Sequence, residues 1–288
     1  MRSGGVVMTV FQRRRSAINA RRRLGAAALA WTAACTMFFP IFWMALTAFK
    51  TEVDALQSPP KLLFTPTLDA FREINGRVHI FGAFYNSVVD SFEGTLVCLV
   101  FALPAAYALA FYPSRRTKHI LLGMLCTKMV PPMTIMIPIY LIIKAMGLLD
   151  TQVSIVIINS LLNMPVVIWM LFSFFREVPK EVLESSRMDG ATPLQDLRLL
   201  LLPLALPGIM STVLLSVILC WNESFWSIVL TSSEGAPLTA VVATFSSSEG
   251  LIWPMLSAVS LIAVAPMLIL GWITQRHVVR GLTLGAVK

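Results

Sequence analysis

Residues 176–207 read REVPKEVLESSRMDGATPLQDLRLLLLPLALP, and long apolar runs lie on both sides of them. The stretch carries nine charged residues, four prolines and one glycine, Gly190, and it is the most polar part of the last two thirds of the chain. A polar block between apolar segments favours an arrangement in which the segments are buried in an apolar environment and the block faces water. This block therefore sets how the rest of the chain is divided.

Local signals within the block predict two short helices. Pro179 suits a first helical turn, and Glu181 and Glu184 lie near the same N-terminus, where the helix dipole favours negative charge. Gly190 stands where that helix would end, at the position that prefers a left-handed residue. The first helix is therefore expected to stop at a sharp turn.

The second helix is expected to run from about 193 to 202 and to end near Pro203. Its start, Thr192-Pro193-Leu194-Gln195, has the form of a capping box with proline at the first helical position. From the residues alone, two interpretations of this helix–turn–helix stay open. It is either a rigid surface that docks into the groove of a partner, or an ordinary loop between two spans.

The apolar runs around the block are too extensive for a soluble domain. Hydrophobic residues make up 57% of the 288 residues and charged residues only 13%, against about 25% in ordinary soluble domains. A membrane-spanning helix needs roughly 20 mostly apolar residues. Six segments meet or nearly meet this requirement: about 24–48, 85–111, 120–146, 153–175, 206–230 and 252–274. The sequence therefore predicts an all-α, polytopic membrane protein with six transmembrane helices, the third of them kinked by Pro131, Pro132 and Pro138.

The distribution of basic residues predicts the orientation of these spans. With both termini in the cytoplasm, the inner segments hold 17 Lys and Arg residues and the outer segments hold 4, which is the bias expected of cytoplasmic loops. The first apolar run is too long for a cleaved signal peptide, so we interpret it as an uncleaved anchor. The predicted organisation is a basic cytoplasmic tail (1–23), a first transmembrane helix (24–48), a periplasmic loop (49–84), a five-helix core (85–274) with a cytoplasmic loop (176–205), and a cytoplasmic C-terminal tail (275–288).

Several classes of function lack support in the sequence. No window has the phosphate-binding form G-x-x-x-x-G-K-[ST] or the zinc-protease form H-E-x-x-H. The four cysteines stand singly inside apolar runs and the three histidines are isolated, so no catalytic residue and no metal ligand is predicted. The net charge of +8 is mostly a topology signal, so no nucleic-acid partner is expected. An intramembrane enzyme is disfavoured because the sequence offers no nucleophile–base arrangement.

The polar block also resembles a family motif. The block follows the spacing E-A-A-x₃-G-x₉-I-x-L-P. It begins with Glu184-Ser185-Ser186, reaches Gly190 after three further residues, and ends with Leu200 to Pro203 after nine more. This pattern is typical of the cytoplasmic loop of inner-membrane permeases of binding-protein-dependent ABC importers, with serine here in place of both alanines and leucine in place of isoleucine. Three further segments resemble the carbohydrate-uptake, maltose-transporter-type branch of that family, the last of them its smaller permease subunit: 129–151, 220–225 and 280–288.

The resemblance implies a type I ABC importer permease fold in a bacterial inner membrane. The chain would pair with a second homologous permease, two ATPase subunits would bind ATP, and a periplasmic solute-binding protein would deliver the solute. The chain itself would bind no cofactor and would not be an enzyme. The predicted solute is a sugar or sugar alcohol, and the alternatives are another solute, such as an amino acid or peptide, and a stand-alone secondary transporter. The residues implied in ATPase coupling are Glu184, Ser185, Ser186, Asp189, Gly190, Leu200, Leu202 and Pro203.

Polar residues inside the apolar runs form a second candidate site, because a charge near the bilayer centre costs about 2.5–3.5 kcal/mol on insertion scales. The candidate substrate-pathway residues are Lys128, Asn159, Asn163, Trp221, Asn222, Glu223 and Phe225. Lys128 and Glu223 have opposite charges and are expected either to pair or to face a wet pathway. Contacts between helices are an equally open interpretation of the polar residues, and anchoring at the membrane interface is the commoner role of aromatic residues such as Trp221 and Phe225. Asp90 and Glu93 are expected to reach the interface at the outer end of their helix.

Overall fold

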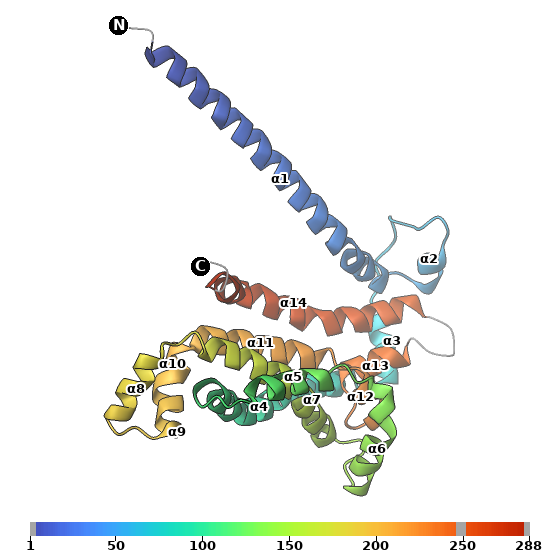
Figure 1. Ribbon diagram of the computed structural model, residues 1–288. Coiled ribbons are helices and arrows are strands. Elements are labelled where there is room, and N and C mark those ends of the chain that lie inside the picture. Colours follow the sequence, from blue (N-terminus) through green and yellow to red (C-terminus); the bar gives the residue numbers. More distant parts are fainter. Residues whose placement is uncertain (1–3, 246–251, 285–288) are drawn as a thin grey trace.

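The computed structural model describes residues 4–245 and 252–284, and within these ranges it contains helices and no strand (Figure 1). The predicted all-α fold class is therefore confirmed. The elements are α1 (Gly4–Ala48), α2 (Glu52–Leu56), α3 (Asp69–Arg77), α4 (Ile80–Phe111), α5 (Thr117–Thr127), α6 (Pro132–Ala145), α7 (Gln152–Phe175), α8 (Lys180–Met188), α9 (Pro193–Gln195), the π-helical η1 (Asp196–Leu201), α10 (Leu202–Leu204), α11 (Leu206–Trp221), α12 (Phe225–Leu230), α13 (Leu238–Thr244) and α14 (Trp253–Leu284).

Four helices of the described chain are long and apolar enough to cross a membrane, namely α1, α4, α7 and α14. Two sharply bent helix pairs are further candidates. The helices α5 and α6 meet at 88°, and the stretch Pro193–Leu204 meets α11 at 86°. If each bent pair counts as one span, the described residues hold up to six spans, the number predicted from the sequence, but the fifth then covers 193–221 rather than the predicted 206–230.

Two predicted spans are interrupted where the sequence predicts continuous helix. The third is broken between Thr127 and Pro132 rather than kinked, because Pro131 adopts an extended conformation that a residue before proline prefers. The predicted fifth span, 206–230, also contains a break, since α11 ends at Trp221 and helix resumes only at Phe225. In both cases the break places backbone polar groups near the middle of an apolar run.

The second helix of the polar block ends at Leu204, one residue beyond Pro203, so its predicted end near Pro203 is confirmed. It passes through η1 and α10 to Leu204 and then bends into α11, whose first turn holds Pro207. Proline is tolerated in a first turn, because the N–H that it lacks has no partner within the helix there. The residues from 180 to 204, which we call the helical loop, are thus joined directly to a membrane-spanning helix.

The centre of the fold is the pair α4 and α7, over which α11 packs. Three alanines at four-residue spacing, Ala102, Ala106 and Ala110, lie buried along one face of α4. Small side chains at this spacing allow the backbones of two membrane helices to approach closely. Leu171 and Phe175 of α7, both fully buried, fill the space beside them. The result is a close-packed helix pair that connects the two ends of the molecule.

The helix α1 projects away from the other helices and contacts α14 near its own C-terminal end (Figure 1). Its side chains from residue 23 to 40 are exposed, including Trp31 at 72% and Met37 at 79%. An exposed apolar surface of this extent is suited to lipid or to another membrane protein. The predicted C-terminal motif 280–288 falls partly on residues 285–288, which lie outside the described residues.

Candidate functional site

The helical loop has the local structure that the sequence predicts. The helix α8 ends at Met188, and Gly190, two residues further on, has a φ of +86° in the left-handed region that favours glycine. The backbone N–H of Gly190 donates to the Arg187 carbonyl at 3.0 Å, and the N–H of Ala191 donates to the Ser186 carbonyl at 3.1 Å. These bonds satisfy carbonyl groups that the end of a helix leaves free. The predicted turn at Gly190 is confirmed.

The predicted capping box is also confirmed. The Thr192 hydroxyl accepts a hydrogen bond from the Gln195 N–H at 3.4 Å, and the Gln195 side chain accepts one from the Thr192 N–H at 2.8 Å. Leu183 of α8 and Leu201 of η1 are almost fully buried in one apolar cluster with α4 and α7. The helical loop is therefore a shaped, well-packed surface rather than an irregular connection.

The exposed side of the helical loop carries apolar residues that the sequence analysis did not select. Met188 is 88% exposed, and Leu194 and Leu199 are each 70% exposed. All eight residues implied in coupling lie in the same helical loop. Five of them are exposed, namely Glu184, Ser185, Asp189, Gly190 and Pro203, and three are half-buried, namely Ser186, Leu200 and Leu202. A shallow hollow of about 300 Å³ opens between Gly190 and Leu199. The sequence feature that could have revealed this surface is the presence of apolar residues within a mostly charged block.

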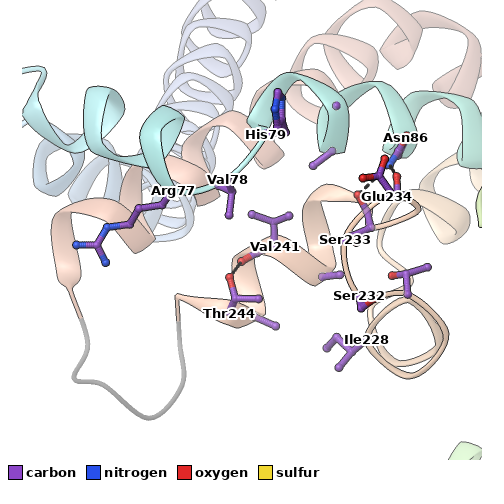
Figure 2. Close-up of a pocket in the computed structure, with 16 residues that line it drawn as sticks. Arg77, Val78, His79, Asn86, Ile228, Ser232, Ser233, Glu234, Val241 and Thr244 are labelled. Atoms are coloured by element: carbon purple, nitrogen blue, oxygen red, sulfur yellow. Dashed lines mark hydrogen bonds between the residues drawn. The ribbon is translucent and has the colours of Figure 1, made fainter. Parts of the chain in front are cut away.

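The opposite end of the helix bundle holds a larger cavity of about 880 Å³, which we call the end cavity (Figure 2). Side chains from the start of α4 form one wall, and side chains from the 228–244 segment form the other (Figure 2). Asn86 fixes the two walls together, because its amide donates to the carbonyls of Glu234 at 2.8 Å and Ala236 at 3.1 Å. Gln152 of α7 in turn donates to Asn86 at 2.6 Å. The cavity wall is thus tied to both central helices.

A clasp at this end joins the loop after α6 to the loop after α12. Asp150, whose φ is +57°, accepts hydrogen bonds from the N–H groups of Ser232 at 2.9 Å and Ser233 at 3.0 Å, and from both of their hydroxyls. The Gly235 N–H donates to the same carboxylate at 3.2 Å. Although burial disfavours its charged form, the bonds from Ser232, Ser233 and Gly235 lower the pKa of Asp150. The residue is therefore ionised at any physiological pH.

The seven predicted pathway residues do not all lie together, although Asn159, Trp221 and Glu223 line one small cavity. Asn163 donates to the Cys220 sulfur at 3.2 Å, Trp221 donates to the Ala263 carbonyl at 3.1 Å, and Asn222 donates to the Ile218 carbonyl at 2.8 Å. These contacts hold helices and helix ends together, which is one of the interpretations left open by the sequence. Phe225 is half-buried and packs edge-on against Trp226.

Lys128 and Glu223 do not form an ion pair in the part of the chain that the structure describes. Lys128 is exposed at the end of α5. Glu223 instead acts at the break before α12, where its carboxylate accepts a hydrogen bond from the Trp226 N–H at 3.0 Å. Its carbonyl accepts bonds from the hydroxyls of Ser227 and Thr239, each at 3.0 Å. The structure therefore gives Glu223 a capping contact at this break.

The expected position of Asp90 at the membrane interface is wrong. Its side chain lies inside the bundle, where the residue is only 2% exposed and neither carboxylate oxygen has a hydrogen-bond partner among the residues that the structure describes. Asn159 of α7 is 1% exposed, and its amide nitrogen also lacks a hydrogen-bond partner within the described part of the chain. Both line a small cavity with Glu223 and Thr239. Glu93, one helical turn further along α4, is exposed as expected.

Comparison with known proteins places this geometry among transport proteins. A profile of the family described as binding-protein-dependent transport system inner membrane component matches residues 101–283. The chain is 32% identical over 250 residues to the probable ABC transporter permease protein y4oR of Sinorhizobium fredii, which covers 87% of this chain and 90% of that protein. It is 32% identical over 254 residues to the diacetylchitobiose uptake system permease protein DasC of Streptomyces coelicolor, covering 88% and 92% of the two chains. It is 31% identical over 255 residues to the trehalose transport system permease protein SugB of Mycobacterium tuberculosis, covering 86% and 92%.

Among solved structures, a chain of a bacterial ABC transporter involved in the import of the acidic polysaccharide alginate has the same arrangement of helices. The TM-score is 0.71 at 22% sequence identity, and the match covers 90% of this chain and 96% of that chain. At this identity the likeness concerns the fold. It confirms the type I importer permease fold predicted from the sequence.

Proposed function

Because the chain belongs to the family of binding-protein-dependent transport system inner membrane components, we propose that it is the permease subunit of an ATP-driven importer that moves a sugar or sugar alcohol into the cytoplasm. The observation that carries this proposal is the helical loop, in which the family spacing from Glu184 to Pro203 coincides with a left-handed Gly190 and a capped second helix. The solute class is supported by the relatives, two of which are named for diacetylchitobiose and trehalose.

The helical loop is proposed to dock on an ATPase. The exposed Met188, Leu194 and Leu199 supply an apolar surface, and apolar side chains in the centre of an interface contribute much of its binding energy. Two ATPase subunits would bind and hydrolyse ATP, while this chain binds no nucleotide and no other cofactor. Closure of the ATPases would displace the loop, and rigid-body motion of the attached helices would open the pathway alternately to each side.

The remaining partners follow from the same proposal. A second homologous permease would complete the pathway, and a periplasmic solute-binding protein would deliver the solute at the end that carries the end cavity. The chain would lie in a bacterial inner membrane with both termini in the cytoplasm, which is supported by the 17 inner against 4 outer basic residues. Reporter fusions test this orientation: those after Arg116 and Gly190 should report cytoplasm, and those after Pro66 and Ala240 should report periplasm.

The function is tested by purifying the tagged chain from its native membrane and reconstituting the complex that it forms. We expect an ATPase and a second permease to copurify, and we expect the complex to accumulate a labelled sugar only with ATP and a binding protein. The purified chain alone should show neither ATP hydrolysis nor uptake. Sugar accumulation by the chain alone, driven by an ion gradient, would instead identify a secondary transporter. Uptake of amino acids or peptides with no uptake of sugars would overturn the solute class.

A further inference from the structure

The helical loop contains one charged side chain that faces away from the proposed docking surface. Asp196, the first residue of η1, is only 1% exposed although it lies in the most polar part of the chain. Moving a carboxylate out of water is costly, and the cost is offset only when hydrogen bonds and opposite charge surround it. The contacts of Asp196 therefore show what this loop is held against.

The Asp196 carboxylate joins three elements. One of its oxygens accepts a hydrogen bond from the Ser186 hydroxyl of α8 at 2.6 Å. The other accepts a bond from the Tyr107 hydroxyl of α4 at 3.2 Å and lies 3.6 Å from Nε of Arg187. The Arg187 guanidinium in turn lies over the ring of Tyr112, at the end of α4, with 4.8 Å between Cζ and the ring centroid. Polar contacts of this kind have a fixed direction, whereas apolar packing alone allows sliding.

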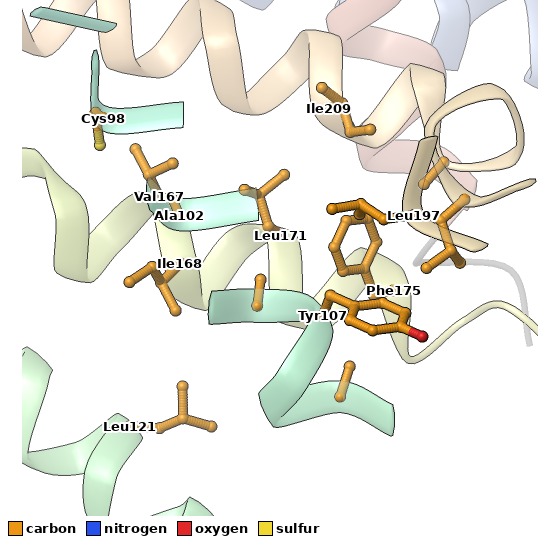
Figure 3. Packing of buried hydrophobic residues seen from close by; sticks show 14 of the residues in the cluster. Cys98, Ala102, Tyr107, Leu121, Val167, Ile168, Leu171, Phe175, Leu197 and Ile209 are labelled. Atoms are coloured by element: carbon orange, nitrogen blue, oxygen red, sulfur yellow. The ribbon is translucent and has the colours of Figure 1, made fainter. Parts of the chain in front are cut away.

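Apolar packing encloses this polar contact. Tyr107, Phe175 and Leu197 belong to one buried cluster (Figure 3), and the Phe111 ring lies 5.5 Å from the Tyr107 ring and 6.5 Å from the Phe175 ring, centroid to centroid. Leu183 of α8 is buried in the same cluster. The Asp196 carboxylate itself is therefore removed from water, and electrostatic contacts of a buried group are stronger than those at an exposed surface.

The helix α4 leads from this contact to the end cavity. Its 32 residues span about 48 Å at 1.5 Å per residue. Tyr107 lies near one end of it, and Asn86, which binds the Glu234 and Ala236 carbonyls of the cavity wall, lies near the other. A displacement of the loop that pulls on Tyr107 would therefore act on the same helix that carries the cavity wall.

We propose that Asp196 is a positioning residue that fastens the helical loop to α4, so that movement of the loop is passed to α4 and through it to the end cavity. The proposal rests on the proposed function, because it assigns the fastening to an importer whose loop is moved by an ATPase. Ser186, one of the two serines that replace alanine in the family pattern, supplies a hydroxyl to this contact. Ser185 is exposed and its hydroxyl bonds within its own helix, to the Glu181 carbonyl at 2.8 Å.

The test measures coupling rather than assembly. The complex carrying Asp196→Ala, Asp196→Asn or Tyr107→Phe is reconstituted in proteoliposomes, and ATP hydrolysed and solute imported are measured together. We expect each variant complex to keep its ATPase and to hydrolyse ATP at about the wild-type rate. We expect the solute imported per ATP to fall at least about fivefold for Asp196→Ala, the low end of typical coupling between sites. Asp196→Glu, which keeps the carboxylate, should restore part of the ratio.

Matched substitutions separate this role from a general effect. Asp69→Asn and Tyr85→Phe change the same residue types at exposed positions of α3 and α4 and should leave the ratio unchanged. The double variant Tyr107→Phe/Asp196→Ala should lose no more coupling than Asp196→Ala alone, because each change removes the hydrogen bond between Tyr107 and Asp196.

The measurements distinguish a failure of the proposed function from a failure of the positioning role of Asp196. If the wild-type complex holds no ATPase or imports no sugar, the proposed function fails whatever Asp196 does. If the wild-type complex couples and Asp196→Ala couples equally well, only the positioning role is overturned. The role is also overturned if Asp196→Ala loses its ATPase, or loses hydrolysis and transport in equal proportion, because Asp196 would then serve docking or folding.

Discussion

Asp150 and Gly235 lie 85 residues apart in the chain, yet the Gly235 N–H donates a hydrogen bond to the Asp150 carboxylate at 3.2 Å. The two backbones are so close that a Cβ on Gly235 would come within 2.9 Å of backbone atoms of Asp150 and Thr151. Backbone atoms cannot move aside as a flexible side chain can. The loop after α12 is therefore held against the loop after α6 at a position that only glycine fits.

Replacing Gly235 by alanine should destabilise the clasp at this end of the molecule. The added Cβ forces a backbone shift, and such overpacking costs typically about 1–3 kcal/mol. We expect Gly235→Ala to melt at a lower temperature than the wild type in a fluorescence-monitored thermal melt of the detergent-solubilised protein. Gly76→Ala in α3 is the matched control, because a Cβ there meets no atom within 4 Å. Equal melting temperatures for Gly235→Ala and the wild type would contradict the close approach.

The clasp should also depend on pH through Asp150. Its pKa is lowered in the folded protein, so its ionised form stabilises the fold at every pH above the unfolded value of about 3.9, and this stabilisation is lost as the pH falls through the folded pKa. Asp150→Asn should therefore lower the melting temperature at pH 7, and the difference from the wild type should shrink below about pH 4. Thermal melts of both proteins between pH 3 and pH 7 measure how the difference in melting temperature changes with pH. A difference that grows as the pH falls would show that the sign is wrong.

The sequence predicts those parts of the structure that depend on neighbouring residues. The left-handed turn at Gly190 and the capping box from Thr192 to Gln195 are set by contacts within a few residues, and both are present. The apolar runs likewise predict the membrane helices, because each run is about as long as a bilayer is thick. The break after Thr127 is only partly visible, since adjacent prolines predict a disturbance but not a bend of 88°.

Contacts between distant parts of the chain could not be read from the sequence. Asp196 binds Tyr107 across 89 residues, and Asp150 binds Ser232 across 82. The burial of Asp90 is not marked by an apolar period, because the buried face of α4 carries small and polar residues at helical spacing, among them Asn86, Ser87, Ser91 and Gly94. A charged residue in such a helix is as compatible with the interface as with the interior until the packing of α7 and α12 is known.

The buried Asp90 carboxylate should lower the melting temperature of the protein. Its carboxylate is buried without a hydrogen-bond partner among the described residues, and an uncompensated buried charge costs several kcal/mol. We expect Asp90→Asn, which keeps the shape and removes the charge, to melt at least about 2 °C higher, since 1 kcal/mol shifts the melting temperature of a chain of this size by roughly 2–4 °C. Asp69→Asn on the exposed face of α3 should melt as the wild type does. A lower melting temperature for Asp90→Asn would show that its charge has a partner in the assembled protein.

Glu223 and Lys128 should behave as independent residues. Glu223→Ala removes the acceptor for the Trp226 N–H, and the loss of a capping contact costs typically about 1 kcal/mol. Lys128→Met changes an exposed end of α5. We expect the free-energy changes of the two single variants to add in the double variant within about 0.5 kcal/mol, measured by chemical denaturation of the solubilised protein. Rescue of Glu223→Ala by Lys128→Met would demonstrate an ion pair that the structure does not contain.

The helical loop offers the sharpest functional prediction, at Gly190. A side chain at this position meets no atom of the chain within 4 Å, so Gly190→Asp is not excluded by crowding. Its cost is a left-handed backbone conformation at φ +86°, on the order of 1–2 kcal/mol for a residue with Cβ. This cost is too small to unfold a bundle of membrane helices, and the variant should insert and pair with its partner permease.

What Gly190→Asp should change is the surface beside Met188 and Leu199, where it adds a charge to a face that is proposed to dock on an ATPase. Burying an unpaired charge in an interface is unfavourable, so the ATPase should dissociate during purification or hydrolyse ATP without import. Copurification of the ATPase and uptake of labelled sugar in cells measure the two effects. Gly76→Asp at the exposed end of α3 is the control for an added charge, since it lies far from the helical loop (Figure 1). If Gly190→Asp keeps its ATPase and transports at the wild-type rate, residues 180–204 are an ordinary loop between two spans, and the docking surface must lie elsewhere on the chain.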